Sequence, residues 1–213
     1  MSIAPAIALI DYGAGNVPSV ERALQTLGFA SKRVTQADGI AGSAAIILPG
    51  VGHYAAIIRA LDEHALRAAL LDAISRAVPF LGICLGLQAL YSSSEESPSL
   101  SGLNLFQGSV RSLPSTVKLP HMGWNRLRLG RASRLLAGVS ESDYFYFAHT
   151  FAAAPSANSN EVVATCEYGA SFAAVLEHNN IFATQFHPEK SGAAGSRVLR
   201  NFASLAARVS NAA

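Results

Sequence analysis

The chain has 213 residues, half of them hydrophobic and 14% charged, with a formal net charge of +2. This composition excludes an intrinsically disordered protein, and the length suits a single domain over residues 1–213. So small a net charge argues against nucleic acid or an anionic membrane as a partner. No segment approaches the roughly 20 apolar residues of a membrane span, and residues 1–13 lack the flanks of a signal peptide.

The first half of the chain alternates apolar runs with amphipathic segments. Residues 5–10 are almost wholly apolar, which predicts a strand buried on both faces, as in parallel sheets. Asn16 is a candidate N-cap for a helix through Leu27, and Gly28 is a candidate stop. Strands are also predicted at 29–35, 44–50 and 78–84, and one long or two short amphipathic helices over 53–77. This order predicts an α/β fold with a largely parallel sheet and helices on both faces.

The second half changes character after Tyr91. Residues 92–99 are expected to form a polar loop. Short alternating segments then predict a mixed sheet with a smaller antiparallel region; they lie at 105–113, 124–129, 143–151, 161–169, 172–178 and 181–187. Asn179 and Asn180 indicate a hairpin turn between the last two, because asparagine tolerates positive φ. Residues 196–208 carry an apolar stripe and predict a closing helix.

Cys84 lies between Gly82 and Gly86 at the end of a predicted strand. A strand that turns directly into a helix forces the corner residue into a strained conformation, and small residues two positions away on either side are then a steric requirement. Such a corner lies where α/β folds bind ligands, and the start of a helix favours a thiolate. The pattern predicts a nucleophile; a buried cysteine that only fills space is the alternative.

The second cysteine, Cys166, lies in an alternating segment and is expected to be a packed strand residue. By count alone, Cys84 and Cys166 could form a disulfide. A chain of this length builds a core without one, so we expect two reduced thiols and a cytoplasmic protein.

A thiol nucleophile needs a base and a group that orients the base. Of the six histidines, His187 differs from the others because it lies in QFHPEKS at the end of a predicted strand. Glu189 follows two residues later, on the same face of an extended chain, where its carboxylate can accept the second ring N–H of His187. A solvated His-Pro-Glu turn is the alternative interpretation.

Several motifs together resemble a known enzyme family. GICLGLQ at 82–88 with QFHPEKS at 185–191 resembles the class I, triad-type glutamine amidotransferases, which implies a flavodoxin-like fold along the whole chain. Within that family, four further motifs are similar to those of the glutaminase subunits of imidazole glycerol phosphate synthases: DYGAGN at 11–16, LPGVGHY at 48–54, PHMGWN at 120–125 and YFAHTF at 146–151.

The resemblance implies a triad of Cys84, His187 and Glu189. In such enzymes the cysteine attacks the side-chain amide of L-glutamine, and hydrolysis of the resulting thioester gives glutamate after ammonia has left. The oxyanion needs backbone N–H donors, expected from Leu85 and from the turn formed by Gly50, Val51 and Gly52. Glycine would let a peptide plane in this turn rotate, which would be an adequate switch.

Gln88 lies one helical turn past Cys84 and can reach the same pocket. The resemblance implies that it holds the amino-acid end of glutamine, with backbone groups of Gly52, Thr150 and Phe151. Many relatives carry tyrosine where this chain has Phe151; a backbone contact would survive that departure, and a hydroxyl contact would not. The alternative for Gln88 is a surface glutamine.

The resemblance also implies a partner, a (β/α)8-barrel cyclase that uses the ammonia in histidine biosynthesis and makes imidazole glycerol phosphate and an aminoimidazole carboxamide ribotide. Ammonia would be protonated in neutral water, so we expect a heterodimer with a dry channel on the Cys84 side. Trp124 is a candidate aromatic anchor, and Asn16, Tyr146 and Lys190 match family positions near that interface. Core packing of Trp124 and a solvated Lys190 are the alternatives.

Other functions stay open at this point. GAGNVP is similar to the dinucleotide fingerprint, but Pro18 occupies the third glycine position. A cysteine peptidase or esterase would share Cys84 and His187 without needing Gln88. A regulatory subunit without turnover would not need an intact triad. Glutaminase subunits for anthranilate, aminodeoxychorismate or vitamin B6 synthesis are the nearest alternatives. No cofactor and no metal ion are expected.

Overall fold

The computed structural model describes residues 6–154 and 160–210. Its central sheet has eight strands in the described ranges, in the order β2-β1-β3-β4-β13-β12-β11-β8. The first five run parallel, and the last three continue the sheet antiparallel. In that order the strands are Ser31–Val34, Ile7–Ile10, Ala45–Gly50, Phe80–Cys84, Ile181–Thr184, Ser171–His178, Val162–Glu167 and Arg128–Leu129.

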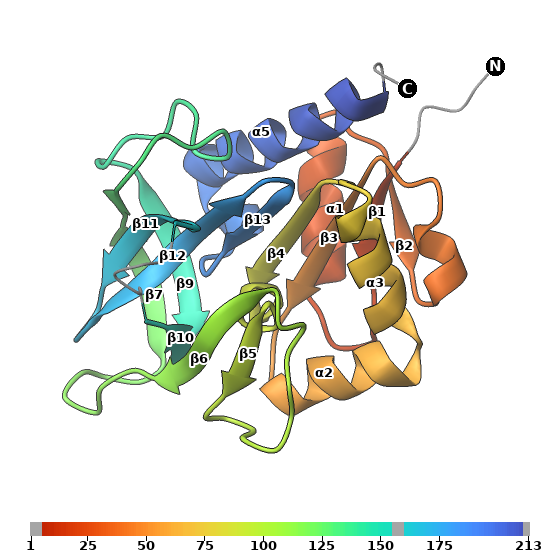
Figure 1. Cartoon of the computed structure of the whole chain (residues 1–213). Helices are drawn as coiled ribbons and strands as arrows, with labels where there is room; N and C mark the ends of the chain where they lie inside the picture. The colour runs from red at the N-terminus through yellow and green to blue at the C-terminus, as the bar shows by residue number, and fades with distance from the viewer. Residues whose placement is uncertain (1–5, 155–159, 211–213) are drawn as a thin grey trace.

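Helices cover both faces of this sheet, as the sequence predicts (Figure 1). The helices α1 (Val17–Thr26) and α5 (Gly192–Ser210) lie on one face, and α2 (Tyr54–Glu63) and α3 (Leu66–Ser75) lie on the other. Side chains of β1 alternate between the two cores: Ile7 and Leu9 pack toward α1 and α5, and their neighbours pack toward α2 and α3. An apolar run without polar alternation is therefore what this buried strand requires.

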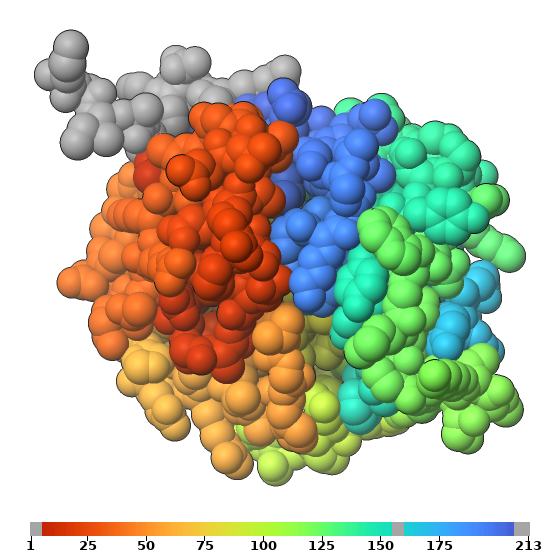
Figure 2. Space-filling view, turned by 180° about the vertical axis from the view of Figure 1, so that it is seen from behind, coloured from red at the N-terminus to blue at the C-terminus, as the bar shows by residue number. Residues whose placement is uncertain are grey.

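Two smaller sheets flank the central one. The first has the order β10-β6-β5, built from Phe151–Ala153, Phe106–Ser112 and Tyr91–Ser94. The second is an antiparallel ribbon of β7 (His121–Arg126) and β9 (Tyr144–His149). Seen from behind, the N-terminal part in red and orange lies beside the C-terminal part in blue, where α1 contacts α5 (Figure 2). Within the described ranges, none of the helices has the length and apolar character needed to cross a membrane.

The structure corrects several predicted boundaries. The polar segment 92–99 is not wholly a loop, because its first residues extend β5, which pairs with β6. The last strand ends at Thr184 rather than at residue 187, and the closing helix begins at Gly192. The segment 53–77 forms two short helices, and Asn179 turns the β12–β13 hairpin with φ of 53° as expected. Polar serines can form a strand here because they pair at a sheet edge.

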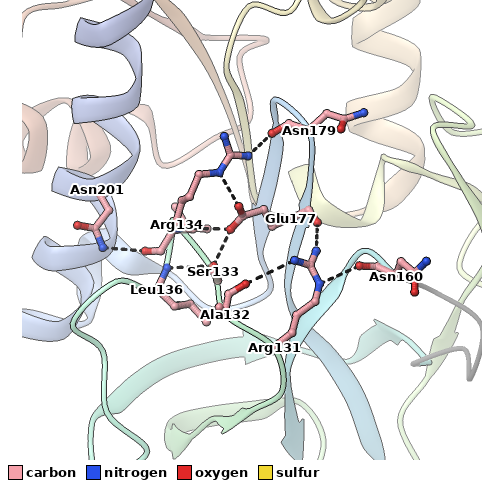
Figure 3. Close-up of polar contacts among 10 residues, drawn as sticks. Arg131, Ala132, Ser133, Arg134, Leu136, Asn160, Glu177, Asn179 and Asn201 are labelled. Atoms are coloured by element: carbon pink, nitrogen blue, oxygen red, sulfur yellow. Dashed lines mark hydrogen bonds and ion pairs between the residues drawn. The ribbon is translucent and has the colours of Figure 1, made fainter.

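The described residues also form two short 3-10 helices, η1 (Ala37–Ile40) and η2 (Pro188–Lys190). Away from the strand ends that carry Cys84, a polar cluster ties the segment after β8 to the β12–β13 hairpin (Figure 3). The buried carboxylate of Glu177 accepts hydrogen bonds from Ser133 Oγ at 2.6 Å, Arg134 Nε at 2.7 Å and the Leu135 backbone at 3.3 Å. Burial raises the pKa of Glu177, but these donors outweigh burial and hold it below its usual range. These hydrogen bonds hold the segment after β8 against the β12–β13 hairpin.

The corner predicted at Cys84 is present. Cys84 ends β4 with φ of 54° and ψ of −104°, and the helix α4 (Leu85–Gln88) begins directly after it. A Cβ on Gly82 would lie 2.6 Å from the Gly86 carbonyl oxygen, and a Cβ on Gly86 would collide with the Leu48 carbonyl. Both glycines are therefore steric requirements, as predicted. The sequence predicts that the start of a helix favours a thiolate at Cys84. Because α4 has a single turn, its dipole stabilises a negative charge less than a longer helix would.

Candidate active site

The Cys84 thiol faces a cavity of about 260 Å³ at the carboxyl ends of the parallel strands. The cavity brings together most of the residues that the sequence singles out: Val51, Gly52, Cys84, Leu85, Gln88, Thr150, Phe151, His187 and Lys190. Gly50, Glu189, Asn16, Tyr146 and Trp124 do not line it.

His187 has Glu189 and Cys84 as neighbours. His187 Nδ1 lies 2.9 Å from Glu189 Oε1, with side chains that are 2% and 1% exposed. This bond leaves the other ring nitrogen free to face Cys84, whose sulfur lies close enough to raise the pKa of the ring. The carboxylate therefore fixes the orientation of the ring, and the ring faces the thiol, as a nucleophile–base pair requires.

The electrostatics of this trio favour an ion pair. Burial alone lowers the pKa of His187. The charge on Cys84, the hydrogen bonds to Cys84 and Glu189, and the Glu189 charge together outweigh burial and raise it to about 10. The imidazolium is therefore retained through neutral pH and is lost only as the pH rises through the alkaline range. An imidazolium held beside the sulfur stabilises a thiolate.

The route by which Glu189 reaches His187 differs from the prediction. The sequence predicts two residues on one face of a strand, but both lie beyond the end of β13, and Glu189 belongs to the 3-10 helix η2. The tight turn folds the carboxylate back onto the ring. Ser191 stabilises the turn, because its hydroxyl donates to the His187 carbonyl at 2.6 Å and accepts from the Tyr146 N–H at 3.0 Å.

Asn16 has a role that the sequence did not indicate. It occupies the N-cap position of α1 but makes no side-chain capping bond. Its amide Nδ2 instead donates to Glu189 Oε1 at 3.1 Å, so the oxygen that holds His187 is itself held from α1. The second oxygen, Glu189 Oε2, is buried and has no hydrogen-bond partner. Asn16 therefore positions the triad carboxylate.

The turn after β3 lies directly against the corner. Gly50 pairs with Cys84 across β3 and β4, and a Cβ on Gly50 would lie 2.6 Å from Leu85 Cβ. Glycine is thus needed at position 50 so that the backbones of β3 and the β4–α4 corner can approach each other. This explains the glycine without the predicted peptide rotation. Gly52 has φ of 97°, which favours glycine at this position. The backbone N–H of Val51 approaches the buried Tyr12 hydroxyl without completing a hydrogen bond.

Gln88 is buried and not a surface residue. Its Nε2 donates to the Phe151 carbonyl at 2.7 Å and to Gln185 Oε1 at 3.2 Å. Gln185 Nε2 in turn lies 3.5 Å from Cys84 Sγ. The contact between Gln88 and Phe151 is made by the Phe151 backbone, so this contact does not need a side-chain hydroxyl.

The sequence does not indicate two residues at this site: Gln185, which is buried behind the cavity, and Glu96, which lines it. Gln185 lies within QFHPEKS but attracted no role, because its contacts with Gln88 and Cys84 depend on tertiary structure. Glu96 lies in the segment predicted as a polar loop; its carboxylate accepts from the Tyr54 N–H at 2.7 Å and lines the cavity. The sequence shows that this segment is acidic, but not that Glu96, in the turn after β5, lies at the cavity.

A pair of buried histidines supports the cavity wall. His149 Nδ1 lies 2.9 Å from the Phe151 carbonyl, and His149 Nε2 lies 3.1 Å from His121 Nδ1. Burial lowers the pKa of His121 to about 4 and that of His149 to about 3, so both rings are neutral at physiological pH. A carbonyl can only accept, so His149 carries its proton on Nδ1 and His121 donates to its Nε2.

The β7–β9 ribbon exposes aromatic and apolar side chains beside the cavity. Met122 is 65% exposed and lines the cavity, and Trp124 is 55% exposed, so core packing of Trp124 is excluded. Trp124 packs edge-on against Tyr146 with ring centroids 6.0 Å apart. Lys190 is exposed, and its Nζ lies 5.7 Å from the Tyr146 ring centroid, so its solvated charge also lies near an aromatic ring. Met122 and Trp124, two large hydrophobic side chains of this ribbon, are therefore exposed to solvent.

Comparison with known proteins agrees with this geometry. The family model for class-I glutamine amidotransferases matches residues 8–205. Imidazole glycerol phosphate synthase subunit HisH of Moorella thermoacetica is 43% identical over 97% of this chain and 98% of its own. The subunit of the same name from Methanothermobacter thermautotrophicus is 46% identical over 93% and 98%. A solved glutamine amidotransferase with 20% identity over 94% and 98% shares the fold, with a TM-score of 0.76.

Replacing Glu189 with glutamine should lower the pKa of His187. The amide removes a negative charge in contact with Nδ1, so the midpoint of the His187 ring titration should move from about 10 down by about one to two units. Ring resonances followed by NMR against pH measure this directly.

The matched control is Glu63→Gln, an exposed glutamate at the end of α2. It should leave the His187 midpoint unchanged, and His121 and His149 should stay neutral above about pH 5 in every variant. Equal midpoints in wild type and Glu189→Gln would refute the assigned ion pair.

Proposed function

The chain belongs to the class-I glutamine amidotransferase family, and on that premise we propose that Cys84, His187 and Glu189 hydrolyse the side-chain amide of L-glutamine. The protein is a glutamine-hydrolysing enzyme and acts as the glutaminase subunit of an imidazole glycerol phosphate synthase. The observation that carries the residue assignment is the buried contact of a cavity-facing thiol with an imidazole that a carboxylate orients.

The proposed reaction has two halves. The Cys84 thiolate forms a bond to the side-chain carbonyl carbon of glutamine, and the carbon–nitrogen bond breaks as His187 gives its proton to the leaving nitrogen. Ammonia leaves, and a γ-glutamyl thioester remains. Water then attacks the thioester while His187 takes its proton, the carbon–sulfur bond breaks, and glutamate departs with the thiolate restored.

The oxyanion formed in each half needs preorganised donors. The Leu85 N–H is a first-turn donor without an intrahelical acceptor and lies next to the sulfur. The second donor would come from the turn of Gly50, Val51 and Gly52. Since the Val51 N–H lies against Tyr12, a rotated peptide would be needed to aim it at the substrate. Losing one such donor costs roughly 3 kcal/mol in other enzymes, so this rotation is sufficient to switch activity.

The cavity offers complementary groups for the amino-acid end of glutamine. Both N–H groups of Gln88 are engaged, which leaves its carbonyl oxygen to accept from the substrate ammonium group. The Glu96 carboxylate lines the same cavity and adds a negative charge. Backbone groups of Gly52 and Thr150 remain the proposed donors for the substrate carboxylate. This selectivity for a free amino acid disfavours a peptidase or an esterase.

Subunits of this type act with a synthase partner, for which we propose a (β/α)8-barrel cyclase in a heterodimer. The exposed ribbon with Met122 and Trp124 borders the cavity, which supports docking there and a shielded path for ammonia. Lys190 and Tyr146 extend this surface. Both cysteines are unpaired, which supports a reducing compartment such as the cytoplasm. We propose one glutaminase domain along the chain.

Glutaminase activity should require Cys84 and should rise when the partner is present. Glutamate release is measured for the chain alone, with a candidate cyclase, and with the cyclase and its ribonucleotide ligand. Cys84→Ala should abolish turnover under all three conditions, whereas Cys166→Ala, which alters the buried cysteine outside the cavity, should retain it. Turnover by Cys84→Ala would overturn the assignment.

Trp124→Ala should weaken docking without unfolding the chain, because the side chain is largely exposed. A central aromatic anchor contributes about 2 kcal/mol or more, which is roughly a 30-fold rise in Kd. Calorimetric titration with the cyclase measures it, with Arg59→Ala on the exposed side of α2 as the control. An unchanged Kd and unchanged ammonia transfer would show that the partner docks elsewhere.

A further inference from the structure

Gln185 is a fully buried polar side chain between the substrate pocket and the nucleophile. It follows β13 directly and precedes His187 by two residues. Its side chain touches Gln88 on one side, with 3.2 Å between Gln185 Oε1 and Gln88 Nε2, and Cys84 on the other, with 3.5 Å between Gln185 Nε2 and Sγ. Burying an amide is costly unless such bonds are made.

The neighbours of Gln185 determine which of its atoms faces the sulfur. The Phe151 carbonyl can only accept, so the group of Gln88 that lies 2.7 Å from it must be the NH2 group. That NH2 group also faces the Gln185 amide, which must present its oxygen to receive the bond. The nitrogen of Gln185 therefore points toward Cys84. The Phe151 carbonyl thus fixes the orientation of the Gln88 amide, and the Gln88 amide fixes that of the Gln185 amide, which faces the sulfur.

The sulfur of Cys84 is thus approached by two donors from one short segment, the ring of His187 and the amide of Gln185. A thiolate accepts such hydrogen bonds more strongly than a thiol does, so a fixed N–H favours the ionised form and holds one side-chain rotamer. A hydrophobic residue of the same length would fill the space without doing either.

We propose that Gln185 is a further catalytic residue, whose amide N–H stabilises the Cys84 thiolate and aims it into the cavity, and whose carbonyl ties this contact to Gln88. The proposal rests on the proposed function and deepens it. Gln185 adds a neutral donor that does not depend on pH, alongside the imidazolium of His187. Through Gln88, it also links the substrate pocket to the attacking atom.

The test is the alkylation rate of Cys84 by iodoacetamide against pH, measured on Gln185→Met. Methionine keeps the length and apolar bulk of the side chain and removes both hydrogen bonds. The alkylation rate at neutral pH should fall about tenfold. In the complex with the cyclase, kcat for glutamine should fall about tenfold or more, with a smaller change in KM.

The matched control is Thr184→Val, which removes a buried hydroxyl from the adjacent position without touching the sulfur. It should alkylate at the wild-type rate. Gln185→Met and Thr184→Val leave the same titratable groups around Cys84 and its cavity. A change in the alkylation rate in Gln185→Met alone therefore reports on position 185. These groups are Tyr12, Glu96, His149, His187 and Lys190.

A second variant, Gln185→Glu, covers the case in which methionine disturbs the fold. It keeps an acceptor for Gln88 and loses the amide N–H, so alkylation at pH 8 should again be slower than in wild type. If Gln185→Met and Gln185→Glu both kept the wild-type alkylation rate and kcat, the role of Gln185 would be overturned and the proposed function would stand. A wild-type complex that does not hydrolyse glutamine would overturn both.

Discussion

The structure depends on one sharp corner, where β4 ends and α4 begins at Cys84. The corner exists because the backbone at Gly82, Gly86 and Gly50 approaches neighbouring atoms too closely for any side chain. These contacts lock Cys84 at positive φ, at the last residue of a strand paired on both sides. The strain is confined to the residue that must project from the sheet, which is where α/β proteins store such strain for function.

Around this corner, neutral groups determine how the charged ones are held. The imidazolium of His187 lies between a sulfur and a carboxylate, and all three are largely shielded from water. Asn16 holds the carboxylate, and Gln185 and Gln88 hold the sulfur side through amides that carry no charge. The neutral pair of His121 and His149 stiffens the wall that presents the Phe151 carbonyl. Shielding from water strengthens each of these interactions.

Much of this could be predicted from the sequence, because it rests on local rules. Glycines two residues before and after Cys84 indicated the corner, and the apolar runs indicated a parallel sheet. The rest depends on contacts between distant segments. Glu96 lines the cavity from the turn after β5, a strand that its serine-rich segment did not suggest, and the side chain of Asn16 bonds to Glu189 rather than capping its own helix. Glu189 reaches His187 through a 3-10 turn, a geometry that residue spacing alone does not distinguish from a strand.

The central claim is that a single thiolate, at Cys84, attacks the substrate amide carbon. The most direct measurement uses an electrophilic glutamine analogue that reacts at the position of the side-chain carbonyl, followed by peptide mass spectrometry of the complex with the cyclase. The account predicts one label per chain, on Cys84, with loss of activity in proportion to labelling and protection by glutamine. Inactivation with the label on Cys166 or on another residue, while Cys84 stays unmodified, would contradict it.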